Sequence, residues 1–427
     1  MTGIDFIGPS LRSAENQLAN EIARFQGLPK PYRRNNRISE YLSRASFFDA
    51  FELGVQNHRN HGSGEMFRCL SYYSEDEENP ARASKEEFGY VVILSAEFIR
   101  RLVKISSRLE AALDRRPRAS SKPTLAGREP VLRQDRELNT LLAGDRRVSE
   151  PEALRLISKW PSEGPQIELG SWAVFCDLMR LIWLHEWAHA LCGHLALLKN
   201  RRGISTFSEF STKRSGGSPN EGRNFAPNEI MQALEVHADE FAVRYCIDGI
   251  LWRRDPVAEI AGPRIDLVDR LLIFNVACSV FTIVWALEEA KYSPDDTFYP
   301  PALSVVSDKP SPIFVPTKSS HPPAVLRYDR LRAFQRELST RYAVSSGHPE
   351  LRLAVDSFSF DFLRTLGEIS GYFPALEPMT VFIGHTHVQQ QLEAYGDYLV
   401  EIGASLTPEL ERFCYLPTSS LDDNEPS

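Results

Sequence analysis

Long apolar blocks separated by polar segments run along this chain, and they predict a mostly helical protein. Residues 172–198 are apolar on nearly every side, which is typical of a helix buried all round. A second apolar stretch, 271–287, predicts another buried helix. From residue 351 to residue 416 the apolar positions again recur mostly at helical spacing. Helices therefore carry most of the expected core.

A β-branched apolar segment indicates that strands accompany these helices. Residues 89–94 have strand character, and Ser95 directly after them is suited to cap a following helix. This strand is either an edge on which an extended peptide is laid by backbone hydrogen bonds, or an interior strand of the sheet. We predict an α+β fold that is predominantly helical and contains a small mixed sheet.

Composition divides the chain into a core and flanking regions. We expect a mostly helical N-terminal cap region over 1–87, the core over 88–345, a C-terminal helical extension over 346–418 and a tail over 419–427. Residues 114–137 are rich in Arg, Pro, Ser and Lys and poor in large apolar side chains, which predicts a flexible insertion within the core. Residues 201–228 predict a second flexible connection, which could act as a lid.

Charge and cysteine content narrow the class of protein. The 427 residues carry a formal net charge of -8, which argues against a nucleic-acid-binding face. The N-terminus lacks the basic segment followed by an apolar run that marks a signal peptide. The cysteines are scattered without C-x-x-C pairs, which is typical of reduced thiols, so we expect a cytoplasmic protein. They are Cys69, Cys176, Cys192, Cys246, Cys278 and Cys414.

The apolar stretch 271–287 is also the one serious candidate for membrane insertion. It contains Asn275, Ser279 and Thr282, is flanked by charged residues at both ends, and is short for a span of about 20 residues. We favour a buried helix, with membrane association through this stretch as the alternative.

An H-E-x-x-H motif lies inside the first apolar block, with His185, Glu186 and His189 as its defining residues. On a helix the two histidines lie one turn apart on the same face, so both can bind one ion, and Glu186 is then placed as a base. Chance also produces this motif, with both histidines as ordinary core or surface residues. Its position in a buried helix favours a metal site, because a buried histidine pair and carboxylate are costly without compensation.

A second motif supplies the ligand that the first lacks. Glu235 and Asp239 lie four residues apart in E-x-x-A-D, on one face of a predicted helix. A catalytic zinc takes three protein ligands and keeps one position open, and a Glu from a neighbouring helix is one known third ligand. We predict His185, His189 and Glu235 as the ligands of one Zn²⁺ ion, with Asp239 accepting a hydrogen bond from a ligand histidine.

Two further histidines lie near these motifs. In an uninterrupted helix His194 points away from the face that carries His185 and His189, so we interpret it as a structural residue near the helix end. His237 lies two residues from Glu235 and therefore faces elsewhere, and we expect it to be partly buried or to face the solvent.

A third element, S-H-P-P-x-x-x-R, begins at Ser320 and ends at Arg327. With H-E-x-x-H and E-x-x-A-D before it, the chain resembles the gluzincin clan of metallopeptidases, most closely the group that contains HtpX and the CAAX prenyl proteases. The form H-E-x-x-H-x-x-x-G-H is also similar to intracellular bacterial peptidases of the ImmA and Lit types. The resemblance covers roughly Phe88 to Leu331 and implies a zincin-type core.

The resemblance implies a zinc-dependent endopeptidase that hydrolyses a peptide bond in an intracellular protein substrate, with a regulated role in phage defence or stress. It also implies that His321 or Arg327 stabilises the oxyanion, although His-Pro-Pro could equally serve only as a helix start. Two other functions remain open. One is a non-catalytic interaction protein that zinc stabilises, and the other is a membrane-associated quality-control protease.

Overall fold

The computed structural model describes residues 59, 61–74, 81–113, 136–142, 146–157, 169–208, 227–251, 255, 257, 267–292, 321, 322, 324–346 and 386–416. They belong to two compact units. The first unit comprises residues up to 99, together with 182–226 and 401–427, and the second comprises 100–181 and 227–400. Most of the expected cap region, most of the flexible insertion and the tail lie outside the described residues.

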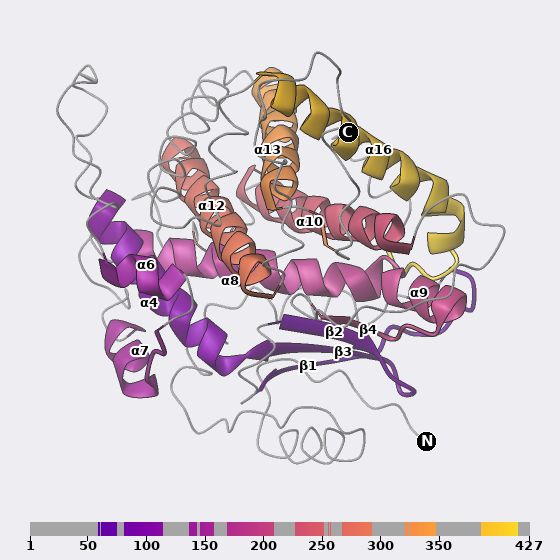
Figure 1. Ribbon diagram of the computed structural model, residues 1–427, viewed down its shortest axis with the longest axis horizontal. Coiled ribbons are helices and arrows are strands. Elements are labelled where there is room, and N and C mark those ends of the chain that lie inside the picture. The colour runs from indigo at the N-terminus through magenta and orange to yellow at the C-terminus, as the bar shows by residue number, and fades with distance from the viewer. Residues whose placement is uncertain are drawn as a thin grey trace, which may run out of the picture. The chain divides into compact units, whose positions relative to one another are not determined.

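A mixed sheet of four strands forms the first unit's framework. The strands are β1 (Cys69–Ser74), β2 (Ala81–Lys85), β3 (Tyr90–Ser95) and β4 (Thr206–Ser208), in the spatial order β1-β3-β2-β4 (Figure 1). β3 pairs in parallel with β1 and antiparallel with β2, and β2 pairs antiparallel with β4. The expected small mixed sheet is therefore confirmed.

The sheet decides between the two alternatives for 89–94 and differs from the sequence-based expectations elsewhere. β3 has a partner on each side, so the interior strand is confirmed and the edge strand is wrong. β1 and β2 come from a region that we assigned to a helical cap, and β4 comes from the expected flexible connection. These strands were missed because serine, arginine or lysine interrupts the apolar positions of β1 and β2, and because β4 is only three residues long.

The register between β1 and β3 places their apolar side chains on one face of the sheet. Leu70 lies opposite Val91, and Tyr72 lies opposite Ile93. Alternate residues of a strand project from the same face, so these four side chains gather on one face of the sheet and form a buried cluster with Phe88 beside it. At the end of β3, the Phe98 backbone N–H donates to Ser95 Oγ at 3.4 Å, and α4 (Ala96–Leu113) begins there as expected.

The helix predicted over 172–198 is interrupted. α8 (Leu169–Leu191) ends before Gly193, which has a φ of 81°, and α9 (His194–Arg202) begins directly afterwards. The left-handed conformation at Gly193 breaks the run of helical hydrogen bonds, and glycine adopts it with little cost. A segment near the C-terminus packs on this turn, because Tyr415 N–H donates to Leu191 O at 2.9 Å. A Cβ at Gly193 would lie 2.7 Å from Phe413 Cβ.

Helices make up the described part of the second unit. α10 (Pro227–Leu251), α12 (Leu267–Tyr292) and α13 (Ala324–Ser346) contact one another (Figure 1). Shorter helices, α6 (Arg136–Leu142) and α7 (Glu150–Ile157), follow α4 in the chain, and α16 (Thr386–Leu410) confirms helix within the expected C-terminal extension. α13 starts two residues after Pro322, so the His-Pro-Pro element does precede a helix start.

α12 contains the apolar stretch that was the candidate for membrane insertion. Phe274, Phe281 and Trp285 on this helix are buried in the protein, as a core helix requires. Across the described residues, no helix combines the length and the apolar character that crossing a bilayer demands. The expectation of a buried helix over 271–287 is therefore met by the described residues of that stretch.

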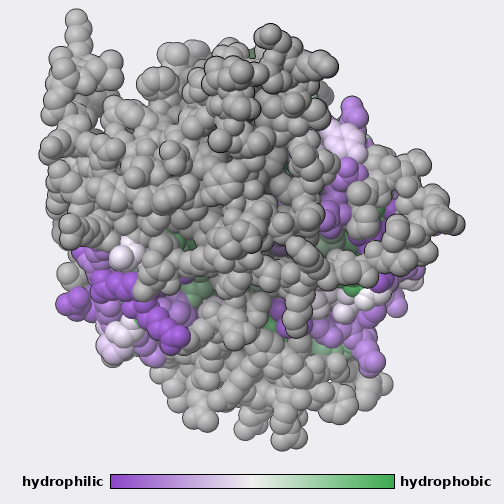
Figure 2. Space-filling model, in the orientation of Figure 1, coloured by the Kyte–Doolittle hydropathy of each residue, from purple (hydrophilic) through white to green (hydrophobic). Residues whose placement is uncertain are grey.

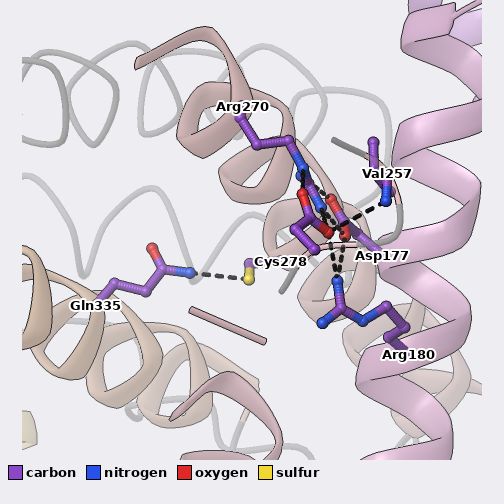
Figure 3. Close-up of polar contacts among 7 residues, drawn as sticks. Asp177, Arg180, Val257, Arg270, Cys278 and Gln335 are labelled. Atoms are coloured by element: carbon purple, nitrogen blue, oxygen red, sulfur yellow. Dashed lines mark hydrogen bonds and ion pairs between the residues drawn. The ribbon is translucent and has the colours of Figure 1, made fainter. Parts of the chain in front are cut away.

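Four buried charged side chains connect α8 with α12 and the segment after α10 (Figure 3). Arg270 on α12 donates to both Asp177 oxygens at 2.6 Å and also pairs with Asp255. Arg180 on α8 donates to Asp255 at 3.0 Å. We call Asp177, Arg180, Asp255 and Arg270 the charged quartet. Two positive and two negative groups balance within it, which offsets the cost of removing them from water.

The described residues visible at the surface in Figure 2 are mostly hydrophilic. Large hydrophobic side chains exposed within the described ranges are Met66, Tyr245, Val344 and Val400, which are well separated along the chain. Scattered single apolar residues of this kind are normal on a protein surface. All six cysteines are free thiols, in agreement with the expectation from their spacing.

Candidate metal centre

The H-E-x-x-H histidines lie on the last turns of α8, within the first unit. His185 and His189 are each 0 % exposed, and their Nε2 atoms are 3.1 Å apart. Zinc binds imidazole nitrogen at about 2.0–2.1 Å, so one ion can reach both atoms at once. The helix delivers this convergence because residues four apart project from the same face. The pair predicted from the sequence therefore fits a metal ion.

Glu186 follows His185 on the same turn of α8 and is buried. Leu184 and Trp187, which flank His185 and Glu186 in the chain, are buried apolar residues, so the carboxylate lies in a part of the helix that excludes water. An ionised carboxylate in such a place is stabilised by a nearby cation or by hydrogen bonds. A metal ion on the adjacent histidines would supply that cation.

His194 lies closer to the motif than an unbroken helix would allow. Its Nδ1 is 3.1 Å from Nδ1 of His189, and its side chain is 0 % exposed. The expectation that His194 points away rested on an uninterrupted helix and is wrong, because the turn at Gly193 brings the ring back. His194 contacts the Nδ1 side of His189, opposite the nitrogen that faces His185.

α10 carries the two acidic residues of the second motif within the second unit. Glu235 is 0 % and Asp239 is 3 % exposed. Arg327 on α13 donates to both oxygens of Asp239 at 2.7 Å, in the two-pronged geometry that suits a carboxylate, and its Nη2 is 3.8 Å from Glu235 Oε2. This pairing fixes the Asp239 carboxylate. Its predicted hydrogen bond to a ligand histidine stays a prediction.

His321 and Arg327, the residues predicted from the third motif, both lie near the carboxylate of Glu235. His321 Nε2 is 3.4 Å from Glu235 Oε1, and its side chain is partly buried. Arg327 is buried, with its guanidinium carbon 5.5 Å from the ring centres of Phe281 and Trp285. Stacking on aromatic faces and pairing with carboxylates hold the guanidinium in place. An oxyanion role for either residue stays a prediction.

His237 is partly buried, as expected from its position two residues after Glu235. Desolvation by burial lowers the pKa of His237 to about 4, so its imidazole is neutral at pH 7. A neutral imidazole retains a lone pair on one ring nitrogen.

The described residues include two groups of side chains whose donor atoms could hold a metal ion. They are histidine, cysteine and glutamate side chains; His185, His189, Cys192 and His194 lie in the first unit, and Glu235 and His237 lie in the second. His185, His189 and Glu235 as the joint ligands of one ion stay a prediction. No family model, curated protein or solved structure matches the chain.

Two features of the site were not anticipated from the sequence. One is the contact between His189 and His194, and the only local signal for it is Gly193, a residue that ends helices. The other is the pairing of Arg327 with Asp239, which joins residues 88 positions apart in the chain. No local pattern reports such a pair, although both residues stood out separately in their motifs.

Proposed function

We propose that this protein is a zinc-dependent endopeptidase that hydrolyses a peptide bond in an intracellular protein substrate. The observation that carries the proposal is the convergence of His185 Nε2 and His189 Nε2, 3.1 Å apart, on a buried helix that also carries Glu186. Two converging imidazole lone pairs are stabilised by a shared cation. A carboxylate one residue away is where a general base for hydrolysis is needed.

Glu235 is the third ligand in this proposal. Its carboxylate is buried, lies 3.4 Å from His321 and 3.8 Å from Arg327, and shares α10 with Asp239. His321 and Arg327 therefore lie beside the Glu235 carboxylate, where groups of this kind can orient a ligand. Three protein ligands leave a fourth position for water, and this distinguishes a catalytic zinc from a closed structural site.

The chain's own residues would perform the proton transfers. Bound zinc would polarise the scissile carbonyl and lower the pKa of a water molecule to about 7. Glu186 would then take a proton from the attacking water and deliver it to the leaving amine. The apolar surroundings of α8 would exclude other water and strengthen the interaction of Glu186 with the developing charges.

Glu186→Gln is the test of this proposal. The substitution keeps the size of the side chain and removes the base, so zinc content should stay at one ion per chain while peptide-bond cleavage falls about 10²–10⁴-fold. Zinc is measured by elemental analysis of purified protein. Cleavage is measured by mapping the new protein N-termini in cells that express either wild type or the variant.

Glu401→Gln is a matched control, because Glu401 is an exposed glutamate on α16. It should change neither zinc content nor the set of new N-termini. Wild-type protein without stoichiometric metal would overturn the proposal. Stoichiometric zinc with no fragments that depend on Glu186 would instead support the non-catalytic interaction protein that zinc stabilises.

A further inference from the structure

The ring of His189 lies between two other imidazoles. Its Nε2 is 3.1 Å from Nε2 of His185, and its Nδ1 is 3.1 Å from Nδ1 of His194. All three rings are fully buried in the first unit. Both nitrogens of His189 therefore have a histidine nitrogen at hydrogen-bonding distance, and the tautomer of one ring constrains the others.

We infer that His194 is a positioning residue that sets the tautomer of His189 for metal binding, an inference that rests on the proposed zinc site. A neutral imidazole has one N–H and one lone pair. If His189 offers the lone pair of Nε2 to the ion, its proton is on Nδ1, and that N–H donates to His194. His194 Nδ1 must then be the acceptor, so the proton of His194 is on its own Nε2.

This hydrogen bond raises the affinity of His189 for a metal ion. A ligand histidine usually donates its second N–H to a carboxylate, a carbonyl or water, which orients the ring and makes the ligating nitrogen more basic. His194 Nδ1 occupies that place here. The neutral acceptor adds no negative charge beside the ion, in contrast to the carboxylate that often fills this role.

The break between α8 and α9 is what makes the contact. At about 100° per residue, a position five residues after His189 in an unbroken helix lies about 140° away around the axis. α8 instead ends before Gly193, and the chain turns at Gly193, which has a φ of 81°. This turn brings the ring of His194, the first residue of α9, to His189. The turn is held from outside by the hydrogen bond from Tyr415 N–H to Leu191 O.

Two substitutions distinguish a role of His194 as a hydrogen-bond acceptor from a role in packing alone. His194→Leu keeps a branched side chain and removes the acceptor, whereas His194→Asn places its carboxamide oxygen at the same number of bonds from Cα as Nδ1. We expect His194→Leu to weaken zinc binding about 10–100-fold in chelator competition. His194→Asn should remain within about threefold of wild type.

Leu197→Ala provides the control for packing alone, because Leu197 is buried on the same helix. It should lower the melting temperature and leave the zinc dissociation constant unchanged. If His194→Leu folds and binds zinc as tightly as wild type, the inference is wrong. If both substitutions at His194 abolish stoichiometric zinc in folded protein, His194 is a ligand, and the inference is equally wrong.

Nitrogen NMR of the histidine rings in the zinc-loaded wild type tests the inference without any substitution. We expect His189 to be protonated on Nδ1 and His194 on Nε2. Protonation of His194 on Nδ1 would contradict the inference even if the variants failed to fold. Wild-type protein that binds no zinc would refute the proposed function itself, so the two failures are distinguishable.

Discussion

The two halves of α8 bury polar side chains for different purposes. Asp177 and Arg180, in the half of α8 that ends near its middle, belong to the charged quartet, in which every charge meets an opposite charge. His185 and His189 near its end bring two like atoms, both able to present lone pairs, to within 3.1 Å. The first arrangement balances its own charges, whereas the second would gain most of its stability from a bound cation.

The largest loss of stability should come from disrupting the charged quartet. Arg270→Leu leaves Asp177 and Asp255 with Arg180 as the one remaining cation of the quartet. Removing one partner of a buried ion pair costs about 3–5 kcal/mol, so we expect the free energy of unfolding to fall by that amount. Denaturant titration followed by circular dichroism measures the change.

A double variant shows whether this loss reflects uncompensated charge. Arg270→Leu combined with Asp177→Leu leaves Arg180 and Asp255, which are 3.0 Å apart and neutralise each other. Part of the lost stability should therefore return. Equal losses in the single and double variants would mean that packing, and not charge balance, explains the cost.

Metal removal should affect the other half. Zinc that binds only the folded protein stabilises it by about 2.7 kcal/mol when its free concentration is 100 times the dissociation constant. We expect a chelator to lower the melting temperature and added zinc to restore it, measured by differential scanning calorimetry. Arg270→Leu should retain this zinc-dependent increment, because the charged quartet provides no ligand. If neither the chelator nor added zinc changed the melting temperature, the proposed metal centre would be wrong.

The smallest effect concerns pH. Burial raises the pKa of Asp177, whereas the charge and hydrogen bonds of Arg270, together with Arg180, outweigh burial and hold the pKa of Asp255 below its ordinary value. A depressed native pKa contributes stability above the unfolded value of about 3.9, and this contribution is lost as the pH falls through the native value. Asp255→Asn should therefore cost about 2 kcal/mol at pH 7, and the difference from wild type should shrink below about pH 4.

Asp248→Asn is the control for the pH measurement, because burial raises the pKa of Asp248 on α10. A raised native pKa disfavours the ionised form in the folded protein, so removing this charge should not weaken the protein at pH 7. If the stability difference of Asp255→Asn persisted unchanged at low pH, ionisation of Asp255 would not be its cause.

Local patterns predicted the elements well where one face or the whole surface is apolar. The buried helix over 271–287, the strand at 89–94 with Ser95 after it, and the helix start after His-Pro-Pro appear in the structure. The strands β1 and β2 were missed, because Cys69–Ser74 and Ala81–Lys85 place small and polar side chains where a simple alternation would require large apolar ones.

The sequence by itself determined the pair His185 and His189, because helical periodicity alone puts residues four apart on one face. It also singled out Glu235, Asp239, His321 and Arg327 as separate candidates. Only the tertiary structure decided that Arg327 holds Asp239 and that Gly193 turns His194 onto His189. Such contacts depend on where a helix ends and on which distant segments pack together, and neither is encoded in a periodicity that repeats within one helix.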